Sequence, residues 1–501
     1  MTPTATVTPS PTATTPAPYA QLPRWRGFNL LEKYRNDIPR WNQAYNEWDL
    51  DFMTEWGFDF IRLPTDYHIW TVSPGVYSEQ PLKEIDQVIA WARVRGIHVN
   101  LCLHRAPGYC VNSPKEPLDL WGYGSGSDEA RQQFAEQWRM FAARYRGIPS
   151  AELSFNLVNE PPGISGEQYG RAVAPAIAGI REIDPHRLII ADGANYGRQP
   201  VPELVPLQVA QSTRGYEPML LTHYRASWID GADKWPVPTW PILVEINQYL
   251  YGDWKFEFQT PLILNGSFPT GAQLSIRIQQ VSNNAELVVR ANGAAVFQKV
   301  FKPGAGQGEW KESTYRPEWN DYLGVYDKEY AVTLPTGTTQ IQIEVVHGDW
   351  LTFSEIRIKP FPGLAANELV IPSGDSLWGV RQEPVVVDAQ GSLSPASGHP
   401  RYSRDTLWSN DVEPWKTFST QKGVGIHVGE WGAHNLTPHA VVLAWMKDCL
   451  ENWRQAGIGW ALWNLRGDSF GVLDSGRIDV AYEEYQGHKL DREMLELLRQ
   501  G

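Results

Sequence analysis

Short apolar runs alternate along the chain with longer segments in which apolar residues recur at helical spacing. Eight runs are typical of buried strands: RGFNLL (26–31), FDFIRLP (58–64), GIHVNLCLHR (96–105), LSFNLVNE (153–160), RLIIADG (187–193), PMLLTHY (218–224), GIHVGEW (425–431) and GWALWNL (459–465). Segments such as 82–96 and 130–147 lie between them and are typical of amphipathic helices. Alternating strands and helices indicate a parallel sheet. Eight such units predict an α/β fold, the (β/α)8 or TIM barrel.

One long gap interrupts this repeat, between the sixth and the seventh run. From about 250 to 360 the helical spacing gives way to two-residue alternation, as in LSIRIQQV, AELVVRANG and IQIEVVHG. This pattern predicts an all-β sandwich of jelly-roll type, inserted after the sixth barrel strand. A poorly patterned segment, about 361–398, returns the chain to the barrel. We expect four parts: a Thr/Pro-rich linker (1–20), the first part of the barrel (21–241), the inserted sandwich with its return segment (242–398) and the second part of the barrel (399–501).

The first 18 residues, MTPTATVTPSPTATTPAP, are almost entirely Thr, Pro, Ala and Ser. A segment of this composition cannot bury a core, which predicts an extended stalk. No signal-peptide pattern precedes it. Because stalks of this kind tether secreted or surface-anchored units, we expect an extracellular or cell-surface-tethered protein.

Composition narrows the classes of partner. The formal net charge of −13 argues against nucleic acid, because phosphate binding needs a basic surface. No apolar run approaches the roughly 20 residues that span a bilayer, so no membrane partner is expected. The three cysteines show neither a disulfide framework nor zinc-ligand spacing. The 23 tryptophans favour sugar binding, since flat aromatic faces stack on sugar rings, although core packing is the alternative.

The ends of the predicted strands carry the candidate chemistry, because a barrel forms its active site where its strands end. These ends carry Arg62, His104, Asn159, Glu160, His223, Tyr224, Glu430, Trp431 and Trp463. Glu160 ends the fourth run and Glu430 the seventh, on opposite sides of the barrel mouth. Glycoside hydrolysis uses such a pair, one carboxyl group protonated and its partner ionised. The alternative is that these glutamates only cap helices.

The order and spacing of Arg62, His104, Asn-Glu-Pro (159–161), His223, Glu430 and Trp463 resemble glycoside hydrolase family five, the cellulase family. The resemblance covers about 24–240 and 400–500, the whole predicted barrel. One departure is visible. The family often places Tyr two residues after the strand-six His, whereas this chain has His223-Tyr224-Arg225. The sequence therefore leaves open which aromatic side chain, if any, contacts Glu430 from strand six.

The resemblance implies a role for each matching residue. Glu160 would be the general acid and then the general base, and Glu430 the nucleophile, kept ionised by Arg62. Asn159 would bind the sugar 2-hydroxyl, and Trp463 would stack beneath the sugar at the cleavage point. His104 and His223 would line the site. The implied retaining reaction needs the two carboxyl groups roughly 5–5.5 Å apart and no metal or organic cofactor.

Further candidates follow from position alone. Glu32, Tyr67, Trp70, Arg105, Trp431 and Asp468 follow predicted strands, where they either bind sugar or are solvated loop side chains. The insert resembles carbohydrate-binding modules and offers Trp254, Trp310, Trp319, Tyr322, Tyr326 and Trp350 for stacking, with core packing as the alternative. Since it follows the sixth strand, the insert either binds sugar independently or forms a wall of the cleft.

The sequence thus predicts a retaining glycoside hydrolase acting on a β-glucan polysaccharide or oligosaccharide, with endo-β-1,4-glucanase as the first choice. A β-mannanase, a β-1,3- or mixed-linkage glucanase, or an exo-acting β-glucosidase would use the same scaffold. A polysaccharide-binding protein with an inactive barrel is the alternative of another class.

Overall fold

The computed structural model describes residues 17–374, 378–467 and 469–501. Most of the expected stalk, and the candidate Asp468, lie outside the described residues. No helix within the described ranges has the length and apolar content needed to cross a membrane.

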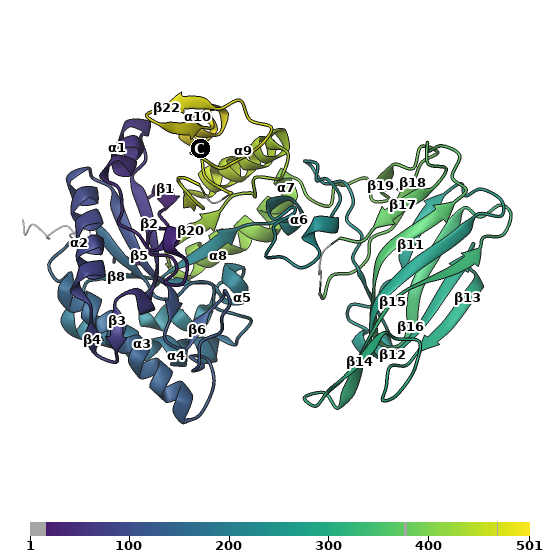
Figure 1. Ribbon diagram of the computed structural model, residues 1–501, viewed down its shortest axis with the longest axis horizontal. Coiled ribbons are helices and arrows are strands. Elements are labelled where there is room, and N and C mark those ends of the chain that lie inside the picture. The colour runs from purple at the N-terminus through teal and green to yellow at the C-terminus, as the bar shows by residue number, and fades with distance from the viewer. Residues whose placement is uncertain (1–16, 375–377, 468) are drawn as a thin grey trace, which may run out of the picture.

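A closed parallel barrel forms the larger domain (Figure 1). Each strand pairs with the next, and the last pairs with the first. In chain order the strands are β1 (Arg26–Asn29), β2 (Phe60–Asp66), β5 (His98–Ala106), β7 (Leu153–Asn156), β8 (Leu188–Asp192), β9 (Ala210–Gly215), β20 (Ile426–Trp431) and β21 (Gly459–Leu462). The predicted (β/α)8 barrel is therefore confirmed.

Helices cover the outer face of the barrel. Two of them lie where the amphipathic segments predict, α2 (Glu79–Val94) and α3 (Ser125–Arg144). The others are α1 (Glu47–Trp56), α4 (Gly166–Ile183), α8 (Glu413–Lys422), α9 (His439–Ala456) and α10 (Arg492–Gln500). Helix α4 starts at a capping box in which the Ser165 hydroxyl accepts a hydrogen bond from the backbone N–H of Gln168, which satisfies a donor left free at the helix start.

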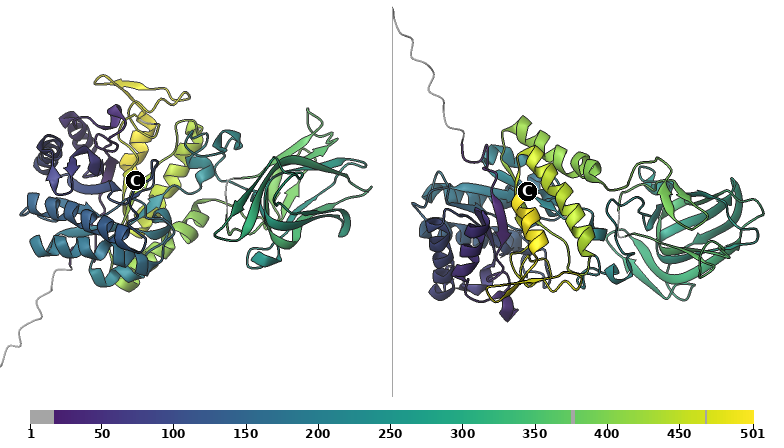
Figure 2. Two further views of the ribbon diagram at one scale, coloured as in Figure 1. Left: turned by 60° about the horizontal axis from the view of Figure 1, so that its bottom comes forward. Right: turned by 90° about the horizontal axis from the view of Figure 1, so that it is seen from above.

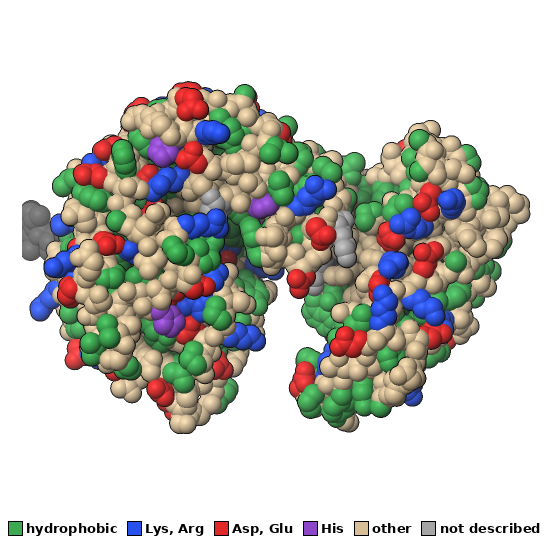
Figure 3. Space-filling view, viewed as in Figure 1, with side chains coloured by type: hydrophobic (Ala, Val, Ile, Leu, Met, Phe, Trp, Pro, Cys, Tyr) green, Lys and Arg blue, Asp and Glu red, His purple; other side chains and the backbone are tan. Residues whose placement is uncertain are grey.

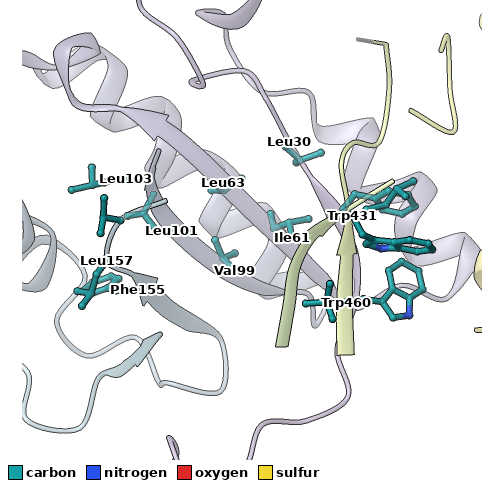
Figure 4. Close-up of a cluster of buried hydrophobic side chains, with 14 of the residues drawn as sticks. Leu30, Ile61, Leu63, Val99, Leu101, Leu103, Phe155, Leu157, Trp431 and Trp460 are labelled. Carbon is teal, nitrogen blue, oxygen red and sulfur yellow. The ribbon is translucent and has the colours of Figure 1, made fainter. Parts of the chain in front are cut away.

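Alternation along the strands separates a hydrophobic outer layer from a polar interior. Ile61 and Leu63 of β2 and the neighbouring Val99, Leu101 and Leu103 of β5 belong to the core shared with the helices (Figure 4). Alternating with them along β2 and β5, Arg62, Asn100 and His98 hydrogen-bond to side chains of β7: Arg62 to Asn156, Asn100 to Ser154, and His98 to Ser154. A second apolar cluster, with Trp25, Phe60, Leu188 and Ala210, fills the end of the barrel where the strands begin.

The sixth barrel strand differs from the prediction. It is β9, with the sequence AQSTRG, and the predicted strand 218–224 instead contains a single helical turn, α6 (Met219–Thr222). The apolar run was misleading because Leu220 and Leu221 pack into the hydrophobic core from a helix, whereas the inward side chains of β9 are polar. The other seven predicted strands overlap observed strands.

The insert follows β9, and its described residues form strands, loops and one short 3-10 turn, Asp253–Lys255. Its two longest strands, β12 (Gln273–Ala291) and β16 (Gln340–Lys359), pair along most of their length. The remaining strands are β10 (Tyr249–Tyr251), β11 (Leu262–Gly266), β13 (Ala294–Phe301), β14 (Glu312–Arg316), β15 (Asp321–Thr333), β17 (Leu369–Pro372), β18 (Val385–Val387) and β19 (Leu393–Pro395). The segment 361–398 was expected to be a poorly patterned return, but β17, β18 and β19 belong to the same sheet.

The insert has its own hydrophobic core, separate from that of the barrel. It leaves and rejoins the barrel at one place, where Ile242 and Tyr402 form an antiparallel bridge with two backbone hydrogen bonds of 2.9 Å. Figures 1 and 2 show it standing beside the barrel. On the face shown in Figure 3, acidic and basic side chains are interspersed over both domains, which is compatible with an uncharged partner.

Candidate active site

A cleft of about 1040 Å³ opens at the ends of the barrel strands. Glu160 and Glu430 both line it, although 270 positions separate them in the sequence. His104, His223 and Trp463 line the same cleft. The structure therefore brings together the two predicted carboxylates and the three predicted ring-bearing residues. Arg62 and Asn159 lie beneath them, and both are fully buried.

Glu430 lies at the end of β20 among three donors. The Nη1 atom of Arg62 is 2.5 Å from its Oε1 atom, and Nη2 of Arg214 is 3.3 Å from the same oxygen. The hydroxyl of Tyr216 donates to Oε2 at 3.3 Å. Burial, and then the charge of Glu430, raise the pKa of Tyr216 well above its usual value, so this hydroxyl stays a donor. The carboxylate is thus held by two guanidinium groups and one hydroxyl, in ion pairs and a hydrogen bond that fix its orientation.

Glu160 follows β7 in an unusual backbone conformation. Its φ of +46° lies in the left-handed region, which is costly for a residue with a side chain. Two neighbours hold this conformation. The backbone N–H of Glu160 donates to Asp192 Oδ2 at 2.9 Å, and the hydroxyl of Tyr109 donates to the carbonyl oxygen of Glu160 at 2.6 Å. The backbone N–H of Tyr196 donates to the carbonyl of Pro161 at 2.7 Å, which ties down the next residue.

Asn159 has its amide orientation fixed by two arginines. Its Oδ1 atom accepts hydrogen bonds from Nη2 of Arg62 and from Nη2 of Arg214, both at 2.8 Å. Because the oxygen is engaged by cations, the NH2 group must point the other way, and it lies 3.3 Å from Glu160 Oε2. This orientation presents an amide donor beside the acid candidate.

The charges at the base of the cleft nearly cancel. Arg62 and Arg214 face three carboxylates, Asp192, Glu160 and Glu430, with Arg62 Nη2 3.9 Å from Asp192 Oδ2. Arg214 also forms a very close ion pair with Asp192. One proton on the three acids makes the cluster neutral. Burial, and then the charge of Glu430, raise the pKa of Glu160 to about 7, although Arg214 opposes this rise. Glu160 is therefore the group that holds the proton.

The two histidines predicted for the cleft are neutral. Burial lowers the pKa of His104 to about 3, and burial followed by the charge of His434 lowers the pKa of His223 to about 3. His104 Nε2 lies 2.8 Å from Asn112 Oδ1, and its Nδ1 atom has no partner. Trp463 lies edge-on to Tyr34, with ring centroids 5.3 Å apart. These rings line the cleft without adding charge to it.

Several predicted contacts lie outside the cleft. Trp431 is fully buried and packs against Trp445, Trp453 and Trp460, so the expectation that it binds sugar is wrong. Tyr224 is also buried in the barrel core and does not line the cleft. In both cases the physical reason is the same: each residue directly follows one that faces the cleft, and consecutive side chains point in different directions.

Three other candidates after the second and third strands are engaged within the protein. The Tyr67 hydroxyl donates to Glu116 at 2.9 Å, and Arg105 pairs with the same carboxylate at 2.6 Å. Trp70 is fully buried, and its indole N–H donates to Gln137. None of the three lines the cleft, which corrects the expectation that they contact sugar.

Glu32 lies in a smaller cavity of about 190 Å³ beside the cleft. Its Oε1 atom accepts from Arg466 at 2.7 Å, while Oε2 is buried and has no hydrogen-bond partner among the residues that the structure describes. Burial and the neighbouring Asp49 raise the pKa of Glu32 to about 7. Arg40 and Trp41 line both this cavity and the main cleft, so Glu32 is adjacent to the site and not part of its catalytic floor.

The sequence reading missed Arg214, Tyr216 and Asp192. Tyr216 stands two residues after Arg214 on the true sixth strand, which is the spacing that the family shows between its strand-six His and Tyr. Arginine here occupies the place of that histidine. The Arg-Gly-Tyr spacing is visible in QSTRGY (211–216). It was overlooked because this strand has no apolar run by which to recognise it. The exposed aromatic side chains of Tyr196 and Trp228, which also line the cleft, come from loops and gave no signal.

Comparison with known proteins agrees with this geometry. The sequence profile described as Cellulase (glycosyl hydrolase family 5) matches residues 15–218. Over these residues, which are less than half of the chain, the protein is similar to glycosyl hydrolase family 5. A crystal structure described as a glycoside hydrolase is 27% identical and superposes with a TM-score of 0.59, covering 95% of this chain and 99% of its own. Cel5A of Thermotoga maritima, solved in complex with mannotriose, shares the fold at 15% identity, with a TM-score of 0.52 and coverage of 95% and 97%.

Two curated relatives are similar to part of this chain. Endoglucanase C of Acetivibrio thermocellus is 28% identical over 193 residues, which are 37% of this chain and 54% of that protein. Cellodextrinase A of Ruminococcus flavefaciens is 26% identical over 201 residues, 38% of this chain and 56% of that protein. The chain thus spans about half the length of these relatives. Within the described ranges, no group of three or more His, Cys, Asp or Glu side chains is arranged to hold a metal ion.

Proposed function

We propose that this protein is a retaining glycoside hydrolase that cleaves β-linked glucan. The bonds that we expect it to cleave fastest are internal β-1,4 bonds. One observation carries the proposal. The guanidinium of Arg214 contacts both carboxylates, with Nε 3.2 Å from Glu160 Oε1 and Nη2 3.3 Å from Glu430 Oε1. A guanidinium is only a few ångströms across, so both carboxylates lie within reach of one glycosidic bond.

The first step divides the work between the two carboxylates. Glu430 attacks the anomeric carbon and forms a glycosyl ester, while Glu160 gives its proton to the departing glycosidic oxygen. The raised pKa of Glu160, about 7, keeps the proton in place until it is needed. The NH2 group of Asn159 lies beside Glu160 Oε2, just beneath the cleft, and would donate to the 2-hydroxyl of a bound sugar.

The second step uses the change in charge that the first step produces. Once Glu430 is an ester it carries no negative charge, and the interaction that raised the pKa of Glu160 is lost. Arg62 and Arg214 then outweigh Asp192, which favours the carboxylate form of Glu160. Glu160 thereby becomes the base that takes a proton from water, and water releases the sugar with its original anomeric configuration.

The choice of substrate rests on the cleft and on the relatives. Several aromatic side chains line the cleft, among them Trp41, Trp228 and Tyr196, which supports the binding of a chain of sugars. Relatives named endoglucanase support a β-1,4-glucan, whereas a relative named probable glucan 1,3-beta-glucosidase A, from Aspergillus terreus, keeps β-1,3 and exo action as alternatives. The mannotriose complex of Cel5A keeps β-mannan as a further alternative.

A polysaccharide-binding protein with an inactive barrel is less well supported. Such a protein would have no need for a buried acid with a raised pKa next to an ionised carboxylate, since uncompensated buried charge is costly. The complete set of Glu160, Glu430, Arg62 and Asn159 favours catalysis.

We also propose that the insert contributes to polysaccharide binding. Of its six candidate aromatic residues, Trp254 and Trp319 are exposed to 48% and 64%. Tyr326 and Trp350 are buried, and Trp310 packs against the core. The expectation that these three residues stack on sugar is therefore wrong, because they pack within the insert. Tyr322 is partly buried. The two exposed indoles are the candidates for contact with sugar.

Replacing the catalytic carboxylates distinguishes their roles. With an aryl cellobioside that has a good leaving group, Glu160→Gln should release about one equivalent of aryl alcohol in a burst. Turnover should then fall by about 10²- to 10⁴-fold, because the leaving group needs no acid but water still needs a base. Glu430→Gln should show no burst, because no ester can form. Rapid-mixing absorbance measures both, and steady turnover near the wild-type rate in either variant would contradict the assignment.

The pH dependence of activity follows from the raised pKa of Glu160. Only the protonated form is an acid, so kcat/KM for an unactivated oligosaccharide should fall as the pH rises through about 7. In Glu160→Gln, the rate constant of the burst with the activated substrate should show no such fall. A wild-type profile that stays flat from pH 6 to pH 9 would assign the acid to another group.

A panel of soluble substrates tests the bond and the mode of cleavage. We expect products of many lengths from carboxymethylcellulose, separated by chromatography, and slower release from β-mannan and from β-1,3-glucan. Release of one small sugar from every substrate would show exo action. A mannan rate above the β-1,4-glucan rate would overturn the first choice of substrate.

The contribution of the insert is measured in the full chain made inactive by Glu430→Gln. We expect Trp254→Ala combined with Trp319→Ala to bind insoluble cellulose several-fold more weakly in a depletion assay. Trp48→Ala is the matched control, since Trp48 is also an exposed indole, at 61%, but belongs to α1 of the barrel. Equal binding by both variants would leave the insert without a role in holding polysaccharide.

A further inference from the structure

Arg214 is an unusual component of the catalytic floor. Its side chain is only 3% exposed, yet it reaches four acceptors that matter to the chemistry: Glu160, Glu430, Asn159 and Asp192. Arg62 already supplies a permanent positive charge to Glu430. A second buried arginine is therefore not needed to keep the nucleophile ionised, and its other contacts call for a separate explanation.

Asp192 provides the counter-charge that lets Arg214 be buried. It is fully buried at the end of β8, and its Oδ2 atom accepts both from Arg214 and from the backbone N–H of Glu160. Its Oδ1 atom accepts from Asn156 Nδ2 at 3.0 Å. One carboxylate thus holds the guanidinium of Arg214 and the left-handed backbone of Glu160 at the same time.

The surrounding backbone makes room for this arginine. A Cβ atom added to Gly197 would lie 2.7 Å from Arg214 Cγ, and one added to Gly429 would lie 2.9 Å from Arg214 Nη1. Either contact is too close for a real side chain, so both glycines keep open the space that the long side chain fills. The site is therefore shaped around an arginine.

We propose that Arg214, held by Asp192, is the positioning residue for the proton-transfer step, fixing the carboxyl group of Glu160 and the amide of Asn159 with a charge that does not titrate. This inference rests on the proposed function and deepens it. Nε of Arg214 donates to Oε1 of Glu160 at 3.2 Å, and the amide of Asn159 donates to Oε2 at 3.3 Å, so both oxygens of the acid are held in place. Arginine stays charged throughout the working pH range. Of Arg214, Asn159 and Glu160, it is therefore Glu160 that gives up and regains a proton during the reaction.

Arg214 and Asp192 also influence the pH at which Glu160 loses its proton, and they do so in opposite directions. Arg214 lowers the pKa of Glu160 and Asp192 raises it, after the larger effects of burial and Glu430. Removing each charge alone should therefore shift the pH profile in opposite directions. The other titratable or charged groups near this pair on the described elements are Arg62, Cys102, His104, Tyr109, Tyr169, Tyr196, Tyr216 and His427.

Three variants of the full chain test the proposal. In Arg214→Gln the loss of the positive charge should move the alkaline limb of the kcat/KM profile to higher pH by about one pH unit. In Asp192→Asn the loss of the negative charge should move this limb to lower pH by about as much. The double variant restores the charge balance, so its limb should return toward the wild-type position. Its kcat should nevertheless stay about 100-fold below wild type with KM changed far less, because the orientation of Glu160 is lost.

Two further variants separate charge from geometry and from general stability. Arg214→Lys keeps the charge but loses the planar fork, so its limb should stay near wild type while kcat falls. Arg93→Gln is the control, since Arg93 forms an exposed ion pair with Glu152 on the outside of the barrel, and it should change neither quantity. Thermal melting by circular dichroism identifies any variant that does not fold.

Two readouts distinguish failure of this inference from failure of the proposed function. The titration of Glu160 can be followed by infrared difference spectra of each protein against its Glu160→Gln counterpart, without turnover. Opposite shifts in these spectra support the pair even if hydrolysis is not the reaction. A hydrolytic wild type whose two single variants shift in the same direction, or not at all, would overturn the inference while leaving the proposed function in place.

Discussion

Two arginines buried among three carboxylates form the interaction on which the rest of this site depends. Burying five ionisable groups costs several kcal/mol for each ion unless the charges balance and every polar atom has a partner. Here Arg62 and Arg214 neutralise Asp192 and Glu430, and Glu160 balances the cluster by holding a proton. Because these residues come from strands two, four, five, six and seven, the balance exists only when the barrel is closed.

This constraint explains why the barrel interior is polar where most cores are apolar. Inward positions of β2, β5 and β7 hold amides, hydroxyls and histidines that hydrogen-bond to one another and to Arg62. The largest apolar cluster of the barrel is shared with the helices, and a smaller one fills the end where the strands begin. The insert places no demand on this arrangement, because it leaves and returns through one hydrogen-bonded bridge, Ile242 with Tyr402, and has a core of its own. A barrel can therefore carry a large second domain without disturbing its catalytic floor.

Much of the fold and part of the site could be predicted from the sequence, for a physical reason. Seven barrel strands are apolar runs, and Arg62, Asn159, Glu160 and Glu430 stand on or directly after these runs. The hydrophobic pattern therefore predicts these strands and also the positions of these four side chains. The sixth strand carries Gln211, Ser212 and Thr213 in place of an apolar run, so Arg214 and Tyr216 were missed with it. Asp192 lay within a predicted strand, but its role is visible only once Arg214 is known to be its partner. Trp431 and Tyr224 were wrongly predicted to bind sugar. Each directly follows a residue that faces the cleft, so its own side chain points away from the cleft.

The most direct test of the account is to trap the covalent intermediate that it requires. A 2-deoxy-2-fluoro-β-cellobioside with an activated leaving group slows both steps, but the first less than the second, so the sugar should accumulate on the nucleophile. The account predicts one added fluorosugar in the intact mass, located by peptide mapping on Glu430, with loss of activity at the same rate. A label on any other residue, or full activity with no label while the natural bond is still cleaved, would contradict it.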